Sequence, residues 1–151
     1  MPDTPGLHDQ PGHLIRRAHQ IAVSVFIDTL GREVTPVQYA VMKLLRDKPG
    51  IDQVTLAQEV ALDTSSAADI AARLEAKGWI ARHLKARGQR SLELTPEGGA
   101  LLARLEPGID RLQQTLLGAF SERQRADFMR LLRQFVELNN DRSRAPLRRE
   151  G

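Results

Sequence analysis

The sequence predicts a mainly α-helical chain with one small β-hairpin, arranged around a winged helix-turn-helix. Apolar residues repeat at spacings of three and four over most of the chain, which is the period of a helix. Two short helical patterns, at 54–60 and 64–77, are separated by a tight corner, which is the helix-turn-helix layout. Two short β-like runs, at 80–84 and 90–94, flank a basic tip that contains a glycine, so we expect a hairpin, or wing.

Length and composition restrict the class of protein. At 151 residues the chain is one domain, or a small domain with helical extensions. No run approaches the roughly 18 to 20 apolar residues that span a bilayer, and acids and prolines at the N-terminus do not form a signal peptide. The absence of cysteine excludes disulfides and thiolate metal sites. We therefore expect a cytoplasmic protein without a membrane partner.

The N-terminal third predicts an arm and two helices. Residues 1–11 are rich in proline and are expected to form a flexible arm. From 12 to 30 the apolar residues cover so broad a face that the helix must be buried on two sides. After a break at 31–34, Thr35, Pro36 and Gln38 supply a capping box with proline at the first helical position. This second helix runs to about Lys48.

The helix-turn-helix and wing follow from local signals. Asp52 or Thr55 begins the first short helix, 61–63 makes the corner, and Asp63 or Thr64 begins the second short helix. Gly78 ends it. In the hairpin, one set of side chains packs inward and one set stays outside, with Gly88 taking positive φ at the tip. The inward set is Trp79, Ile80, Leu92 and Leu94, and the outward set is Arg82, Lys85, Arg87 and Arg90.

The C-terminal third predicts two more helices. Thr95 and Pro96 begin a long one, in which Pro107 is expected to cause a bend near Arg104. A turn at 118–121 ends it, and Ser121 caps a last helix that runs to about Asn140. The β content is expected to be confined to the hairpin.

These elements divide the chain by role. We expect a DNA-binding lobe at 35–96, a helical dimerisation region at 12–34 and 97–141, and a flexible tail at 142–151. The dimer is inferred because the long amphipathic terminal helices, packed only on one another, would leave an apolar face in water. A twofold dimer is the simplest closed assembly that covers it.

The basic charge is concentrated in the second half of the helix-turn-helix and in the wing. Residues 73–95 hold six basic and two acidic side chains, whereas residues 1–72 hold six basic and nine acidic ones. A basic patch binds polyanions through release of their counterions. The alternative is a hairpin whose arginines only keep it solvated. The adjacent helix-turn-helix pattern favours double-stranded DNA.

Other function classes have less support. The sequence contains no nucleophile elbow, phosphate loop or metal motif, and Ser65 and Ser66 beside Asp63 are typical of helix capping. We therefore expect no catalytic residue, no metal ligand and no cofactor. The remaining alternative is a winged helix that contacts only proteins. The absence of acids among the outward wing cations favours phosphate instead.

Five segments in order resemble the multiple-antibiotic-resistance regulator (MarR) family over residues 12–140. They are Leu30 with 34–42 (VTPVQYAVM), Leu56-Ala57 with Val60, 62–66 (LDTSS), 73–80 (RLEAKGWI) and 94–98 (LTPEG). The resemblance implies a homodimeric transcription factor, usually a repressor, that binds a pseudo-palindromic operator. The second short helix would enter the major groove, and the wing tip would reach toward the adjacent minor groove.

The resemblance also implies the DNA contacts. Base contacts fall at the start of the recognition helix, Arg73 follows as a phosphate contact, and the wing adds Lys85, Arg87 and Arg90. The expected base contacts are Thr64, Ser65, Ser66 and Asp69. Many relatives carry Asp ahead of the wing arginines, whereas this chain has Lys85-Ala86. The recognition helix is also poor in Arg and Gln, so short hydroxyls, water and the wing are expected to carry more of the recognition.

Members of this family commonly respond to a small ligand, and the segment HLIRRAHQIAVSVF resembles a subset that controls breakdown of aromatic acids. An aromatic carboxylate is then the expected effector. Arg17 and His19 would pair with its oxygens, and Tyr39 and Met42 would line an apolar slot. The alternatives are an ion pair for Arg17, a surface position for His19, and the core for Tyr39 and Met42.

Overall fold

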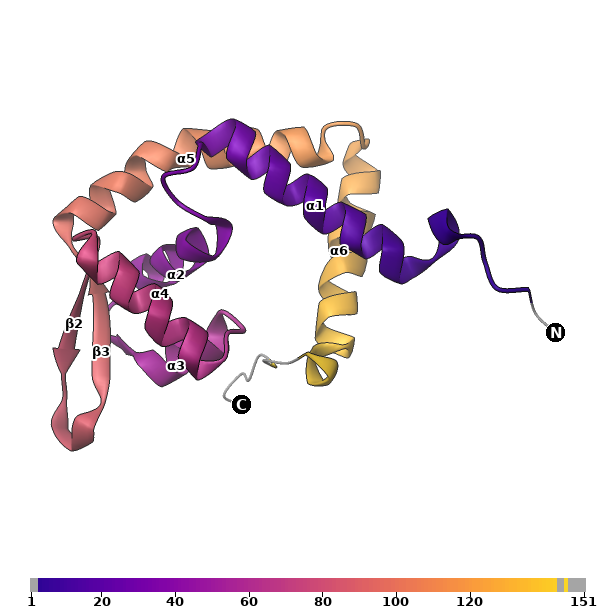
Figure 1. The fold of residues 1–151 in the computed structure, drawn as a ribbon. Coiled ribbons are helices and arrows are strands. Elements are labelled where there is room, and N and C mark those ends of the chain that lie inside the picture. The colour runs from indigo at the N-terminus through magenta and orange to yellow at the C-terminus, as the bar shows by residue number, and fades with distance from the viewer. Residues whose placement is uncertain (1–2, 144–145, 147–151) are drawn as a thin grey trace.

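A computed structural model describes residues 3–143 and 146, and its element order is the one that the sequence predicts, with one strand added. Figure 1 shows the long N- and C-terminal helices on one side and the small sheet with its surrounding short helices on the other. The helices are α1 (Pro11–Leu30), α2 (Pro36–Asp47), α3 (Gln53–Glu59), α4 (Thr64–Ala76), α5 (Pro96–Leu117) and α6 (Glu122–Leu138). The strands are β1 (Ile51–Asp52), β2 (Ile80–Leu84) and β3 (Arg90–Leu94).

Side-chain caps define the starts of five helices. Thr35 and Ser121 each accept from the backbone of the third helical residue, and Gln38 and Gln124 complete two capping boxes. The remaining caps are Asp52 for α3, Asp63 for α4 and Thr95 for α5. Because a cap satisfies amides that have no helical partner, it fixes the first turn of each helix. Of the alternatives left open by the sequence, Asp52 and Asp63 are the capping residues.

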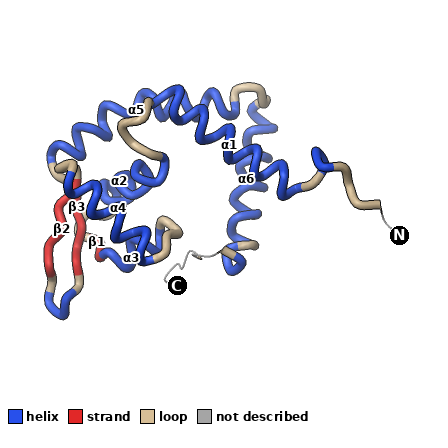
Figure 2. Tube along the Cα trace, in the orientation of Figure 1, coloured by secondary structure: helices blue, strands red, loops and turns tan. Residues whose placement is uncertain are grey.

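The sheet has three strands in the order β1-β3-β2, so the expectation that β structure is confined to the hairpin was wrong. The hairpin strands have the predicted bounds, and Ile51 and Asp52 add an antiparallel edge opposite Leu92 and Ser91 (Figure 2). Gly50, with φ +79°, donates its amide to the carbonyl of Leu92 at 3.0 Å. A strand of two residues is too short to show the alternating sequence pattern of a β-strand, so β1 is recognised only by its pairing with β3.

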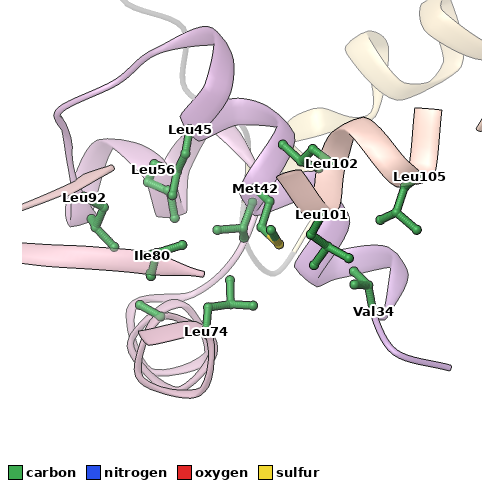
Figure 3. Close-up of a cluster of buried hydrophobic side chains, with 12 residues drawn as sticks. Val34, Met42, Leu45, Leu56, Leu74, Ile80, Leu92, Leu101, Leu102 and Leu105 are labelled. Carbon is green, nitrogen blue, oxygen red and sulfur yellow. The ribbon is translucent and has the colours of Figure 1, made fainter. Parts of the chain in front are cut away.

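One hydrophobic core joins the sheet to the helices around it. Met42 of α2, Leu56 of α3, Leu74 of α4 and Leu92 of β3 are each completely buried (Figure 3). The other buried members are Val34, Val41, Leu45, Ala71, Ile80, Leu101, Leu102 and Leu105. The contributions from α5 connect this lobe to the long helices. Burial of such side chains contributes about 1.5 to 3 kcal/mol each.

The terminal helices α1 and α6 bury few of their side chains against the rest of the chain. The α5 helix continues through Pro107 and changes direction in its middle (Figure 1), where the Cβ of any residue replacing Gly108 would lie 2.3 Å from Leu30 Cδ2 of α1. By contrast, α6 has no buried residue at all. The N-terminal arm contains a short 3-10 helix, Leu7–Asp9, and α1 then starts at Pro11. Most of the expected tail at 142–151 lies outside the described residues.

Candidate nucleic-acid interface

The first turn of α4 presents small polar side chains from a rigid cap. The Asp63 carboxylate accepts from the Ser66 amide at 2.7 Å and from the Ser66 hydroxyl at 2.9 Å. The Ser66 hydroxyl hydrogen is therefore committed to the cap, and its oxygen remains as an acceptor. Thr64, Ser65 and Asp69 are exposed on the same helix, and Arg73 is exposed two turns further on. The candidate base contacts thus lie together at one end of α4.

A left-handed residue sets the corner before α4. Ala61 has φ +54°, a conformation that residues with a Cβ adopt at a cost of about 1 to 2 kcal/mol. The chain then returns so that the Leu62 amide donates to the carbonyl of Ala57 at 2.8 Å. The angle between α3 and α4 is therefore fixed by backbone contacts as well as by the core.

The Asp63 cap predicts a pH dependence of stability. The Ser66 amide, followed by its hydroxyl, holds the pKa of the Asp63 carboxyl below its ordinary value. Because the folded-state pKa is lowered, the contribution is fully present above the unfolded value of about 3.9 and is lost as pH falls through the folded value. We expect Asp63→Ala to lower the thermal unfolding temperature at pH 7.

Thermal unfolding of wild type and of Asp63→Ala between pH 7 and pH 2.5 tests whether the Asp63 carboxylate caps α4. The difference in unfolding temperature between wild type and Asp63→Ala should be constant above about pH 5 and should become smaller at acid pH. Asp63→Asn is the control, since an asparagine cap accepts the same amide without titrating. A difference that stays constant down to pH 2.5 would show that the carboxylate does not cap α4.

The root of the wing is attached to α4 by an ion pair that the sequence did not predict. The Glu75 carboxylate accepts from Arg82 Nη2 at 2.9 Å and from the Arg82 amide at 3.3 Å. Arg82 keeps only 17% of its side chain exposed. Its placement among the free outward cations was therefore wrong, because Glu75 neutralises it. The Arg82 side chain, first through its hydrogen bond, lowers the pKa of Glu75.

The tip of the wing carries the remaining cations. Lys85, Arg87 and Arg90 are all exposed, and the Lys85 amide donates to the carbonyl of Gln89 at 2.6 Å to close the turn. Arg87 has φ +68° and Gly88 has φ +75°, so two successive left-handed residues form the tip. Positive φ at central turn residues is what tight hairpin connections require. Arg87 to Arg90, with Asp52 to Val54 at the start of α3, line a cavity of about 270 Å³.

The four candidate ligand residues differ in exposure and lie on two helices, α1 and α2. Arg17 and His19 are exposed on α1, while Met42 is completely buried, which favours the core role for Met42. Tyr39 is half-buried, with its ring centroid 6.3 Å from that of Phe26. Because an α-helix rises about 1.5 Å per residue, Arg17 lies roughly 13 Å along α1 from Phe26. A ligand bound by both Arg17 and Tyr39 would have to bridge that separation.

Metal-binding clusters and membrane-spanning helices are both absent from the described residues. Within residues 3–143, no group of three or more His, Asp and Glu side chains is placed to hold a metal ion. Over the same part of the chain, no helix is both long enough and apolar enough to cross a membrane.

Comparison with known proteins decides the family. A model described as the MarR family matches residues 34–91. The transcriptional regulator HosA of Escherichia coli O127:H6 is 35% identical over 106 residues, which cover 69% of this chain and 78% of HosA. The chain belongs to the MarR family. As a member of this family of transcriptional regulators, it is not an enzyme.

Solved structures of MarR-type regulators confirm the winged-helix fold. PcaV of Streptomyces coelicolor, in complex with its natural ligand, has a TM-score of 0.84 and 32% identity, covering 89% of this chain and 97% of PcaV. BpsR of Bordetella bronchiseptica has a TM-score of 0.81 and 28% identity, covering 89% of this chain and 99% of BpsR. The BpsR structure concerns regulation of its DNA binding by 6-hydroxynicotinic acid. The resemblance drawn from the sequence is thereby confirmed.

Proposed function

We propose that this MarR-family chain is a cytoplasmic, homodimeric repressor that binds a pseudo-palindromic operator and is released by a small aromatic carboxylate. The observation that carries the DNA-binding part is the shared surface of α4 and the wing. Exposed polar side chains lie at the start of α4, the C-terminal end of α4 holds the root of the wing through Glu75 and Arg82, and the hairpin tip has three exposed cations and no acid between 84 and 92. Short polar groups suit base edges, and the cations suit phosphates.

The dimer is supported by the apolar surface of the terminal helices. In the single chain, Leu131 is 54% exposed and Phe135 46% exposed on α6, and Leu14 is 50% exposed on α1. Further exposed apolar residues on these helices are Ile15, Ile21, Phe128, Leu132, Val136 and Leu138. A helix with no buried residue gains little from its own chain, so a second copy is the partner that stabilises α6.

A gel-shift titration on duplex DNA from the upstream region of the gene, repeated at several salt concentrations, tests DNA binding. The proposal expects a shift that weakens steeply with salt, because each lysine or arginine contact releases a counterion. A complex that does not respond to salt, or the absence of a complex, would contradict it. Either result would favour the alternative function, in which the winged helix contacts only proteins.

The effector part has support from chemistry and from the relatives. Arg17 and His19 offer two exposed groups on α1 that suit a carboxylate and a phenol oxygen. In the similar protein BpsR, an aromatic acid, 6-hydroxynicotinic acid, regulates DNA binding. By favouring a separation of the two recognition helices that differs from one DNA turn, roughly 34 Å, the ligand would release the operator.

Arg17→Ala is expected to raise the concentration of aromatic acid needed for half-maximal release by roughly tenfold or more, since an ionic hydrogen bond contributes about 1.5 to 3 kcal/mol. A panel of hydroxybenzoic and hydroxynicotinic acids, titrated into the DNA complex, provides the measurement. Arg16→Ala is the matched control, because the Arg16 guanidinium contacts His13 Nδ1 at 3.2 Å on the same helix. If no acid in the panel releases wild-type protein, the effector proposal fails while DNA binding stands.

A further inference from the structure

Leu84, the last residue of β2, is 76% exposed, more than any other large apolar side chain in residues 3–143. Single exposed leucines are common and by themselves indicate nothing. The surroundings of Leu84 are less common. It is followed by Lys85 and paired across the hairpin with Arg90, so an apolar side chain lies among the cations of the tip.

The register of the hairpin shows which way Leu84 faces. Directly paired residues share a face of the sheet, and successive residues alternate between faces. Leu84 therefore lies on the same face as Ile80 and Arg82. Ile80 is buried in the core, and Arg82 is held by Glu75 of α4. Leu84 continues this line beyond the edge of the core, on the side of the wing that is turned toward α4.

The opposite face of the wing is different. There His83 Nε2 and Glu93 Oε1 lie 2.7 Å apart, and Ser91 is buried beside β1. The wing thus has one face on which Leu84 lies beside the exposed Arg90 and one face that carries the hydrogen-bonded pair of His83 and Glu93. Only the face turned toward α4 matches a linear polymer in which charged groups alternate with less polar groups.

A DNA strand is such a partner, because each phosphate is followed by a deoxyribose whose carbon edge is weakly polar. If α4 occupies the major groove and the wing tip approaches the neighbouring groove, the strand between the two grooves passes the α4 side of the wing. We propose that Leu84 packs against a deoxyribose of this strand, next to a phosphate bound by Arg90, its partner across the hairpin. Leu84 is then a positioning contact that sets how closely the wing approaches the backbone, and it rests on the proposed DNA binding.

An apolar contact and an arginine–phosphate contact differ in how their contribution to affinity depends on salt. Burying apolar surface adds affinity without releasing counterions, whereas each phosphate contact contributes about 0.9 to the slope of log affinity against log salt. Leu84→Ser is expected to weaken operator binding roughly tenfold, since two partly exposed leucines are lost per dimer. The salt slope should stay at the wild-type value.

The test uses fluorescence anisotropy of the full-length protein with a labelled operator duplex at four salt concentrations. Leu84→Met should retain near wild-type affinity, because it keeps the apolar volume. Val37→Ser, a change at a 40% exposed residue on α2, is the matched control and should leave binding unchanged. Thermal unfolding of each variant verifies that the hairpin is folded.

Hydroxyl-radical footprinting adds a direct measurement, since these radicals attack deoxyribose hydrogens. Leu84→Ser should lose protection at sugars beside the wing and keep protection at the α4 sites. Wild-type affinity in Leu84→Ser, or a loss of affinity accompanied by a lower salt slope, would overturn the inference. Failure of wild-type protein to bind duplex DNA would overturn the proposed function as well, so the two failures are distinguishable.

Discussion

Replacing Arg87 and Arg90 together with alanine is expected to lower operator affinity at physiological salt by roughly a hundred- to a thousandfold. A dimer would lose four phosphate contacts, and the salt slope should fall by about 3 to 4 units. In the described part of the chain, neither guanidinium takes part in a salt bridge, so both are available to phosphate. Anisotropy titrations from 50 to 300 mM salt measure both quantities.

The matched control removes the same charge elsewhere. Lys43 is paired with Asp47 at 2.9 Å, and Arg104 lies 3.7 Å from Glu33, so both cations already have partners. Lys43→Ala with Arg104→Ala should change the slope by much less than the wing double variant. Equal effects in the two double variants would mean that net charge alone, and not the wing, determines binding.

The second large effect concerns the junction between the wing and α5. A Cβ added at Gly98 would lie 2.0 Å from the carbonyl oxygen of Trp79 and 3.2 Å from Leu94 Cδ2. The Trp79 carbonyl also accepts from the Thr95 amide at 3.1 Å, so it cannot move without breaking the cap region. Gly98→Ala should therefore cost about 1 to 3 kcal/mol or more, as overpacked cores do.

The neighbouring glycine supplies an internal control. At Gly99 an added Cβ would meet nothing within 4 Å, and the residue lies in the same helix. Gly99→Ala should stabilise the protein by about 0.5 to 1 kcal/mol. Thermal unfolding at one protein concentration should then place Gly98→Ala about 5 to 10 °C below Gly99→Ala. Equal unfolding temperatures would contradict the close contact between α5 and the wing root.

The sequence predicted features that depend on neighbouring residues. The capping box of Thr35 and Gln38, the cap at Ser121 and the bounds of both hairpin strands are local patterns, and the structure has them. Features that depend on distant residues were missed. The β1 strand has two residues and exists only through pairing with β3.

In the candidate site, too, features set by neighbouring residues were predicted and features set by distant residues were not. The exposed start of α4 and the cations at the wing tip follow from local pattern and charge, and the structure brings α4 and the wing root together. The neutralisation of Arg82 could not be predicted, because Glu75 reaches it across the end of a helix and a turn. The sensor residues are the least defined, since Arg17 and Tyr39 lie on different helices and no local pattern sets their distance.

In the proposed complex, two copies present α4 and the wing to one duplex at a fixed separation. Selection of bound sequences from a random duplex library, followed by measurement of the mass of the complex, tests it directly. We expect inverted half-sites whose centres lie about 10 to 10.5 base pairs apart, bound by two chains. A single asymmetric site bound by one chain, or no enrichment of any duplex sequence, would contradict it.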